Sequence, residues 1–397
     1  MLSVAGCRGP APFGPAANLA ASGADFPTIA VDSTAGAVYV TWAQSGPDSL
    51  WNVMLARGTG EGHFETPVRV NAIPGDLSAS KEMPPQVVVD GRGRVYVGWV
   101  STRRSPGESR EDIGIRLARS DDGGRTFGPD ATVSSDPGGG PSANFYFDLA
   151  TGPDGSLWAA WLDLRVYVDS LAARPPGHDM DVPENDVEFR VARSVDRGAS
   201  FAAAAVLDTV ACICCRTALA AGPDSIVHAL WRHVFPGSIR DFQTARSLPG
   251  RTAFAGPVRV HEDRWVLNGC PDIGPDIAVD ARGGVHAAWY TGAAGRQGLW
   301  YASSADGGRS FGEPFDLITE GFIPPSEIKL AALGDLVWGV WEDRRSSRRE
   351  VVAGLLPAGR RYVLGNGAAP AIAAGASTVA VAWAEGGRIL VRTASPP

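Results

Sequence analysis

Residues 275–289 read PDIAVDARGGVHAAW, two short apolar runs on either side of a turn that contains two glycines. Two apolar runs joined by such a turn predict a pair of antiparallel β-strands. Because the runs are almost continuously apolar, we expect strands that are covered on both faces. The same pattern ends in a tryptophan seven times along the chain, over residues 27–42, 85–99, 147–161, 217–231, 275–289, 328–341 and 370–383.

A third and a fourth strand are expected after each of these pairs. Residues 67–70 and 257–260, PVRV in both places, are examples of the fourth strand. Successive tryptophans of the pattern are 42 to 70 residues apart, which suits one four-stranded blade per repeat. The sequence therefore predicts an all-β fold, a β-propeller of four-stranded antiparallel blades, with seven blades favoured over six.

The last repeat ends after its third strand, at about Arg392. Near the other end of the chain, residues 12–15 (PFGP) resemble the start of a fourth strand, as in residues 311–314 (FGEP). We expect residues 12–20 to complete the last blade, so that pairing of the N- and C-terminal segments closes the ring and leaves no exposed sheet edge. Residues 12–395 then form a single propeller domain.

The chain has a net charge of −7, and arginine supplies nearly all of its positive charge, since Lys81 and Lys329 are the only lysines. This charge balance lacks the excess of positive charge that is typical of proteins that bind nucleic acid. The sequence also contains no apolar run of about 18 residues that could span a membrane. Residues 4–7 (VAGC) match the end of a bacterial lipoprotein signal, in which the cysteine is acylated after cleavage. Residues 1–11 are therefore a candidate signal remnant and linker, with Cys7 as a candidate lipid anchor.

Three turns between third and fourth strands have the sequence Ser-x-Asp-x-Gly-x-Thr/Ser-Phe, at residues 120–127, 194–201 and 304–311. They resemble the Asp-box, or bacterial neuraminidase repeat, of sialidase-like β-propellers. We expect these residues to be structural, because Asp and Ser/Thr side chains bond nearby backbone N–H groups and glycine accepts a positive φ. The phenylalanine is expected to plug the space between blades. The resemblance also implies an extracytoplasmic location, periplasmic or at the cell surface.

A true sialidase, as the resemblance implies, uses three arginines for the substrate carboxylate, a Tyr/Glu nucleophile pair and an Asp acid/base. The Phe/Tyr-Arg-Ile-Pro motif that usually carries the first arginine is absent, and the nearest string, residues 322–325 (FIPP), lacks the arginine. The family's enzymes also have six blades. We therefore predict an exported ligand-binding or scaffold propeller that is not a true sialidase, and leave open whether it is an enzyme. In the alternative, a divergent exo-sialidase-like glycoside hydrolase, the weak catalytic candidates are Asp163, Asp343 and Glu342.

In a propeller whose first strands line the channel, the loops after each tryptophan share one face with the connections between blades, and the Asp-box turns lie on the opposite face. Arginines after the tryptophans predict a mouth that binds a carboxylate or another anion. The candidates are Arg103, Arg104, Arg165, Arg232, Arg344 and Arg345. The expected partner is a carbohydrate, an anionic small molecule or a protein. In the other interpretation, Asp163 with Arg165 and Asp343 with Arg345 are local ion pairs that pin loops.

Four cysteines are concentrated where blades connect. Cys212, Cys214 and Cys215 precede the fourth repeat and Cys270 precedes the fifth, so their sulfurs are expected to converge near the channel. Three interpretations stay open: two disulfides, neither joining Cys214 to Cys215, a thiolate site for copper or zinc, or a reactive thiol beside Arg216. Candidate additional ligands are His233, His261 and His286, although each by itself is better interpreted as an ordinary loop or strand histidine.

The longest insertion within a blade lies between Val166 and Glu188 and contains His178, Asp179 and Glu184. We interpret it as a solvated loop, with a lid over the mouth or a cation-binding loop as the alternatives.

Overall fold

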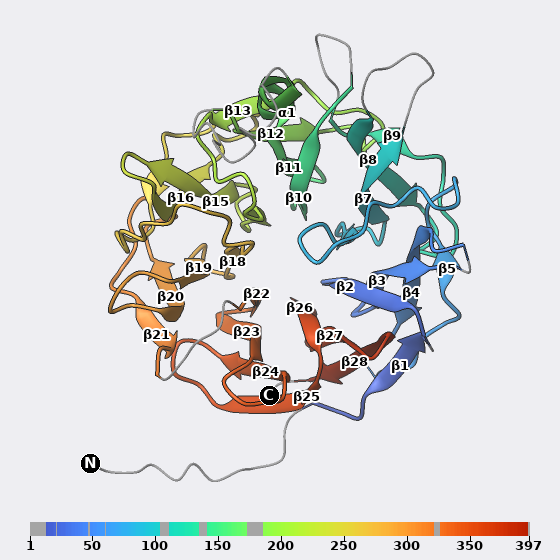
Figure 1. Cartoon of the computed structure of the whole chain (residues 1–397). Helices are drawn as coiled ribbons and strands as arrows, with labels where there is room; N and C mark the ends of the chain where they lie inside the picture. Colours follow the sequence, from blue (N-terminus) through green and yellow to red (C-terminus); the bar gives the residue numbers. More distant parts are fainter. Residues whose placement is uncertain are drawn as a thin grey trace.

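The computed structural model describes residues 13–20, 22–46, 48–59, 61–103, 111–134, 141–172, 186–320 and 326–395. Its strands form seven sheets of four strands each, arranged in a ring (Figure 1). Every pairing within a sheet is antiparallel, as in the pairs β2–β3 and β3–β4. The prediction of a seven-bladed propeller is confirmed.

The strands are given blade by blade. Blade 1 consists of β2 (Ala24–Val31), β3 (Val38–Ser45), β4 (Trp51–Gly58) and β5 (Val68–Arg69), and blade 2 of β6 (Gln86–Val89), β7 (Val95–Arg103), β8 (Asp112–Ser120) and β9 (Ala131–Thr132). Blade 3 consists of β10 (Asn144–Thr151), β11 (Leu157–Asp163), β12 (Glu188–Ser194) and β13 (Ala205–Asp208), and blade 4 of β14 (Ala218–Ala221), β15 (Val227–Phe235), β16 (Ile239–Arg246) and β17 (Val258–Arg259). Blade 5 consists of β18 (Asp276–Val279), β19 (Val285–Thr291), β20 (Gly298–Ser304) and β21 (Phe315–Ile318), and blade 6 of β22 (Ile328–Leu333), β23 (Leu336–Asp343), β24 (Glu350–Leu355) and β25 (Arg361–Asn366). Blade 7 consists of β26 (Ala368–Gly375), β27 (Thr378–Glu385), β28 (Arg388–Ala394) and β1 (Ala17–Ala20).

The first strand of each blade lies nearest the axis of the ring (Figure 1). Each of these innermost strands contacts the innermost strand of the next blade, from β2 and β6 around to β26 and β2. In blades 1 to 6 the other strands follow outward in chain order, and in blade 7 β27 and β28 are followed by β1. The expectation that the first strand of each repeat faces the channel is therefore confirmed.

The tryptophan that ends each repeat pattern fills the space between two blades. All seven are at most 2% exposed: Trp42, Trp99, Trp161, Trp231, Trp289, Trp341 and Trp383. Each packs into a cluster with residues of the preceding blade, as Trp231 of blade 4 does with Phe189 of blade 3. Large apolar side chains buried between sheets account for the covered faces that the apolar runs predicted.

The two ends of the chain meet in blade 7. β1 pairs with β28, with Ala17 opposite Val391, and Phe13 forms a further bridge with Ala394. The Phe13 ring is buried and lies edge-on to Trp338 at a centroid distance of 5.8 Å. Closure of the ring by the N-terminal segment is confirmed, and the outer edge of β28 is covered.

One helix, α1 (Arg165–Ala172), starts the insertion that was interpreted as a loop. That interpretation is wrong for the six helical residues that lie within the insertion, 167–172. A helix of eight residues is too short to show a helical period in the sequence. The acidic residues and histidine of the insertion at 178–184 lie outside the described residues, as do Cys7 and residues 322–325. Within the described part of the chain, no helix has the length and apolar character needed to cross a membrane.

The three Ser-x-Asp-x-Gly turns are built from side-chain-to-backbone hydrogen bonds. Ser194 Oγ donates to Asp196 Oδ1 at 2.8 Å and accepts from the Gly198 N–H at 2.8 Å. The Ser200 hydroxyl donates to Asp196, and together with the Ser200 N–H it lowers the pKa of Asp196 to about 2. The same bonds recur in the turns at 120–127 and 304–311. The phenylalanine of each turn packs into the cluster between its own blade and the preceding one. These turns are structural, as expected.

Candidate functional site

Strand pairing defines the two faces of the ring. Asn144 at the start of β10 pairs with Asp163 at the end of β11, so the segments that precede innermost strands lie beside the loops that follow the tryptophans. We call this side the mouth face. Leu157 at the other end of β11 pairs with Ser194, where a Ser-x-Asp-x-Gly turn begins. Those turns therefore lie on the opposite face, as the sequence predicted.

A pocket opens on the mouth face. It encloses about 1020 Å³, open solvent included, and we call it the mouth pocket. Its charged lining residues are Asp25, Lys81, Glu327, Glu342, Arg344 and Arg349. Phe26, Lys81 and Ala369 also line a second pocket of about 820 Å³ between the innermost strands, so the mouth pocket leads into the channel.

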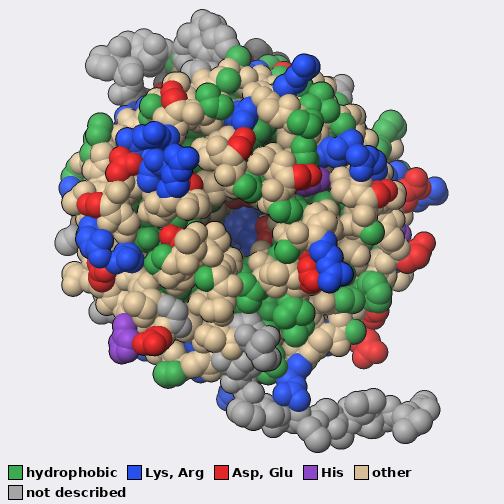
Figure 2. All heavy atoms as spheres, turned by 180° about the vertical axis from the view of Figure 1, so that it is seen from behind, with side chains coloured by type: hydrophobic (Ala, Val, Ile, Leu, Met, Phe, Trp, Pro, Cys, Tyr) green, Lys and Arg blue, Asp and Glu red, His purple; other side chains and the backbone are tan. Residues whose placement is uncertain are grey.

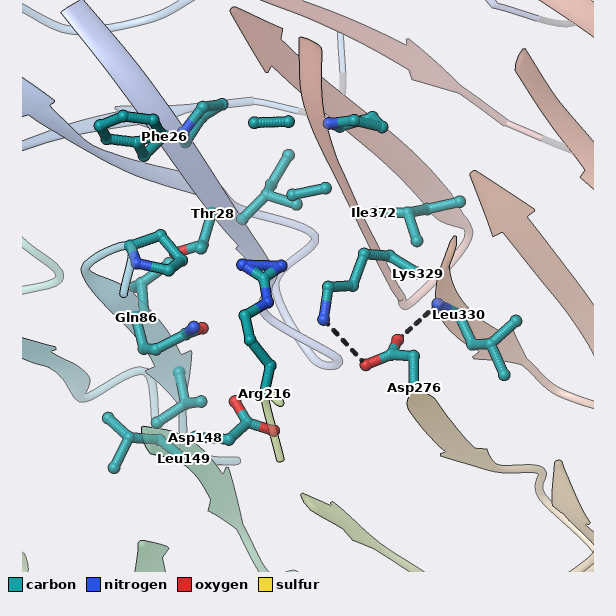
Figure 3. Close-up of a pocket in the computed structure, with 18 of the residues that line it drawn as sticks. Phe26, Thr28, Gln86, Asp148, Leu149, Arg216, Asp276, Lys329, Leu330 and Ile372 are labelled. Atoms are coloured by element: carbon teal, nitrogen blue, oxygen red, sulfur yellow. Dashed lines mark hydrogen bonds and ion pairs between the residues drawn. The ribbon is translucent and has the colours of Figure 1, made fainter. Parts of the chain in front are cut away.

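The channel is lined by charges of both signs (Figure 3). Lys329 Nζ lies 3.3 Å from Asp276 Oδ1. Arg216 points into the same space, pairs with Glu327 at 2.6 Å and donates to the carbonyl of Lys81 at 2.7 Å. A view of one face of the ring shows Lys and Arg side chains, with acidic groups beside them, at the bottom of the central hollow (Figure 2).

Asp148 on β10 carries the most perturbed carboxyl group of the channel. Its Oδ2 accepts a hydrogen bond from the Leu219 N–H at 2.8 Å. Burial raises the pKa of Asp148 to about 6, although the positive charge of Lys329 and the Leu219 N–H act in the opposite direction. The carboxyl group therefore changes its charge just below neutral pH.

The predicted arginine-lined mouth is only partly formed. Arg344 lines the mouth pocket. Arg165 pairs with Asp163 at 2.6 Å and Arg345 pairs with Asp343 at 2.7 Å. These are the loop-pinning ion pairs of the alternative interpretation.

The other predicted arginines lie elsewhere. Arg103 pairs with Asp76 and Asp130. Arg232 is 2% exposed, and its guanidinium donates to two backbone carbonyls and lies 4.0 Å from the centre of the Phe242 ring. Arg232 therefore does not line the mouth, because its side chain packs between sheets. Arg104 lies outside the described residues.

The three carboxylates named as catalytic candidates do not form one constellation. Asp163 is 5% exposed and also lies 3.1 Å from Arg190 Nε. Asp343 accepts two hydrogen bonds from the side chain of Arg345, which lower its pKa against the opposing effect of burial. Glu342 lines the mouth pocket, and its Oε1 accepts from the Ala369 N–H at 2.8 Å.

Sequence reasoning missed the cations that line the channel, Lys81, Arg216 and Lys329. The sequence contained a sign of these positions, because the chain has only two lysines, and both line the channel pocket. A second sign was the position of Arg216, directly after Cys215 and two residues before the innermost strand β14.

The four cysteines converge on the mouth face. The Sγ atoms of Cys212, Cys214 and Cys215 all lie within 4.8 Å of one another, and these residues are 1%, 4% and 2% exposed. A second group shares Cys214: its sulfur, the sulfur of exposed Cys270 and a carboxylate oxygen of Asp272 also lie within 4.8 Å of one another. No disulfide joins Cys212, Cys214, Cys215 and Cys270 in the structure, and the buried group of three sulfurs could hold a metal ion.

Local structure and neighbouring blades hold the buried thiols. The Cys212 N–H donates to the carbonyl of Arg232 on β15 at 2.8 Å, and the Cys215 N–H returns to the carbonyl of Cys212 at 3.3 Å. The ring of Tyr146 and the side chain of Val234 pack against the group. Because the Cys212–Cys215 segment connects β13 to β14, the three sulfurs point into the junction of blades 3 and 4.

Two buried arginines lie beside these thiols. Arg240 Nη1 donates to Cys212 Sγ at 3.3 Å, and Arg240 Nε donates to the carbonyl of Leu267 at 2.8 Å. Burial alone would raise the pKa of Cys212, but donation from Cys214 and Cys215 and the charges of Arg232 and Arg240 bring it well below its usual range. The environment therefore favours a negative charge on the sulfur of Cys212. The pKa of Cys214 is raised by its hydrogen bond with Cys212, and that of Cys215 is raised chiefly by burial.

The histidines named as additional ligands belong to other interactions. His233 Nδ1 lies 2.7 Å from Asp208, His261 Nδ1 lies 2.8 Å from Asp263, and His286 contacts Tyr301 and Asp280. Neither group of ligand atoms found around the cysteines contains a histidine among the described residues. These contacts agree with the interpretation of all three as ordinary loop and strand histidines.

The chain resembles known proteins in its structure but not in its sequence. No profile of a known protein family matches the sequence, and no curated protein matches it. Among solved structures, an ulvan lyase of polysaccharide lyase family PL25, bound to -[GlcA(1-4)Rha3S]-, has a TM-score of 0.59 at 11% identity, with 95% of each chain covered. The chain shares the fold of such propellers.

Two further structures support this likeness. The Hadza microbial sialidase Hz136 has a TM-score of 0.53 at 13% identity, with 92% of this chain and 74% of that chain covered. An α-L-arabinanase of Penicillium chrysogenum has a TM-score of 0.52 at 13% identity, with coverage of 94% and 93%. At such identities the likeness concerns the fold, a β-propeller similar to those of several carbohydrate-active enzymes.

Proposed function

We propose that this protein binds a soft metal ion, Cu(I) in preference to Zn(II), through Cys212, Cys214 and Cys215. The observation that carries the proposal is the burial of three mutually close thiols beside two arginines. Thiolates are the ligands that select Cu(I) and Zn(II) in proteins. Sulfurs that each lie about 2.3 Å from one metal ion are roughly 3.8 Å apart. The three Sγ atoms lie within 4.8 Å of one another, so they need to move only slightly to bind one ion together.

The charges around the thiols agree with this proposal. Within the described residues, the hydrogen-bond partners of the Arg232 and Arg240 side chains are backbone carbonyls and the sulfur of Cys212, and no carboxylate is among them. A buried guanidinium without an anion is costly. Three thiolates around one Cu(I) ion leave two negative charges, which the two guanidiniums neutralise. Zn(II) with the same three ligands would leave one cation in excess.

The decisive experiment is metal analysis of the reduced protein. We expect reduced protein loaded anaerobically with Cu(I) to keep one ion per chain after desalting. Cys212→Ser and Cys215→Ser are expected to lower its Cu(I) affinity at least about tenfold. Cys7→Ser is the matched control and should retain full loading, because Cys7 precedes the propeller.

Two outcomes would overturn the proposal. One is a reduced protein that holds no Cu(I) or Zn(II) after desalting. The other is a thiol count of one, that of Cys7, before reduction together with no metal uptake after it, which would assign the other four cysteines to two disulfides. Preferential retention of Zn(II) over Cu(I) would contradict the charge argument.

The mouth pocket favours a second function, binding of an anionic carbohydrate. Lys81, Arg344 and Arg349 line this pocket beside three carboxylates, and the pocket continues into the channel. Proteins of similar fold include the lyase bound to a glucuronate-containing polysaccharide. The resemblance of the three turns to the Asp-box supports an extracytoplasmic location, where such ligands occur.

Calorimetry with a glucuronate-containing oligosaccharide tests this second function. We expect binding that Arg349→Ala weakens and that Arg251→Ala, an exposed control on the opposite face, leaves unchanged. A fluorogenic sialoside assay tests for hydrolysis. Turnover that Asp163→Ala abolishes would replace the binding function with a hydrolase, whereas absence of both binding and turnover would exclude this second function for these ligands.

A further inference from the structure

We infer that Cys214, Cys270 and Asp272 form an uptake site, from which a metal ion passes to the buried thiols Cys212, Cys214 and Cys215. The inference rests on the proposed metal-binding function and adds a route to it. Its basis is that the chain presents two groups of ligand atoms, each within 4.8 Å, with the sulfur of Cys214 common to both.

The two groups differ in exposure. Cys212, Cys214 and Cys215 are buried, whereas Cys270 and Asp272 are exposed on the connection from β17 to β18. The residue between them, Pro271, lines the mouth pocket. An ion that arrives through this pocket therefore meets Cys270 and Asp272 before it can reach Cys212 or Cys215.

The ligand types favour movement inward. A soft ion binds a carboxylate oxygen more weakly than a thiolate, so Asp272 is the ligand of the uptake site that is most readily replaced. Cys214 remains bound while the bonds from the metal to Asp272 and Cys270 break and bonds to the sulfurs of Cys212 and Cys215 form. Cys212 and Cys215 bind the metal as thiolates: one proton that they lose passes to the thiolate of Cys270, any other passes to solvent, and the oxidation state of the metal is unchanged.

Charge also differs between the two groups. Arg240 donates to Cys212 at 3.3 Å, which places a fixed positive charge next to the buried thiols. The second group combines two sulfurs with a carboxylate, and Asp272 and Glu82 both act on the phenol of the neighbouring Tyr146 as negative charges. An acidic exposed group attracts the cation, and the buried group with its guanidinium counter-charges stabilises the metal–thiolate complex.

Uptake kinetics test the inference. Reduced protein is mixed with the Cu(I)–bicinchoninate complex, and loss of its absorbance is followed in a stopped-flow instrument. We expect Cys270→Ser to slow uptake about tenfold and Asp272→Asn about threefold, with final occupancy still one ion per chain and affinity changed less than about threefold. Glu262→Gln is the control, because it removes one exposed negative charge from the same connection and leaves the sulfurs in place.

The outcomes separate this inference from the proposed function. If the wild-type protein takes up no Cu(I), the proposed function fails. If it loads fully but Cys270→Ser loads at the wild-type rate, only the uptake site is overturned. A Cys270→Ser variant that loses Cu(I) at equilibrium as completely as Cys212→Ser would make Cys270 a ligand of the final site and would also overturn the inference, as would equal slowing by Glu262→Gln and Asp272→Asn.

Discussion

Arg240 is the residue through which the surrounding protein acts most directly on the thiols. Its side chain is 7% exposed, is held by the carbonyl of Leu267 and donates to Cys212 Sγ. Arg232 lies behind it and donates to the carbonyl of Arg240 at 3.0 Å. Both guanidinium groups are therefore held in place before a metal ion binds. Little free energy is then spent on rearranging these side chains during binding.

Arg240→Met is expected to weaken Cu(I) binding about tenfold, because the thiolates lose a neighbouring positive charge and a hydrogen-bond donor. Competition with a Cu(I) chelator measures the affinity. Arg240→Lys should recover part of the loss, since it restores the charge, and the exposed Arg251→Met should have no effect. An unchanged affinity in a correctly folded Arg240→Met protein would contradict the role assigned to this arginine.

Asp148→Asn addresses the carboxyl group of the channel. Because its pKa is raised to about 6, the folded protein binds a proton that the unfolded chain releases between about pH 4 and 6. The contribution of Asp148 to stability therefore falls as pH rises through this window, and about 3 kcal/mol is lost above it. We expect Asp148→Asn to unfold at higher urea concentration than the wild type at pH 7.5, with the difference vanishing near pH 4. A variant that is less stable at pH 7.5 would show that the charged form is favourable here.

At the scale of elements, the Ser-x-Asp-x-Gly turns position the outermost strands. The strands that follow these turns, β9, β13 and β21, contain only two, four and four residues, too few to define their own register. The turns help to define the register of these strands, because the serine hydroxyl and the aspartate carboxylate accept hydrogen bonds from backbone N–H groups and fix the conformation of the turn.

Ser194→Ala tests this role. The substitution leaves the buried Gly198 N–H without its acceptor, which costs about 1–3 kcal/mol. Thermal and urea unfolding should show the loss, and Cu(I) loading should be unchanged because the turn lies on the face opposite the cysteines. Val195→Ala, at a side chain that is 74% exposed in the same turn, is the control. Stability equal to that of the control would mean that the turn does not depend on this hydroxyl.

At the scale of the whole molecule, closure of the ring depends on a short N-terminal segment. Phe13 is 6% exposed and packs against Trp338 and Tyr362 of blade 6. The segment also covers the edge of β28, which would otherwise present unpaired backbone groups to other chains.

Phe13→Ala is expected to destabilise the propeller by about 3–5 kcal/mol, because it removes a large ring from a packed site. Denaturation measures the loss, and size-exclusion chromatography should detect association through the exposed edge. Phe315→Ala, at a ring that is 49% exposed, is the control. A Phe13→Ala protein as stable and monodisperse as this control would mean that the N-terminal segment does not lock the ring.

The sequence by itself determined the propeller, the number of its blades and the way its ends join, because these follow from local patterns that repeat: apolar runs, turn residues and one tryptophan per blade. It also determined that Cys212, Cys214, Cys215 and Cys270 converge, since connections of adjacent blades must lie side by side. Only the tertiary structure decided that Arg232 is buried and that Lys81 and Lys329 line the channel. The residues that surround a side chain in a ring come from two or three blades, and their distance from one another in the sequence carries no sign of that contact.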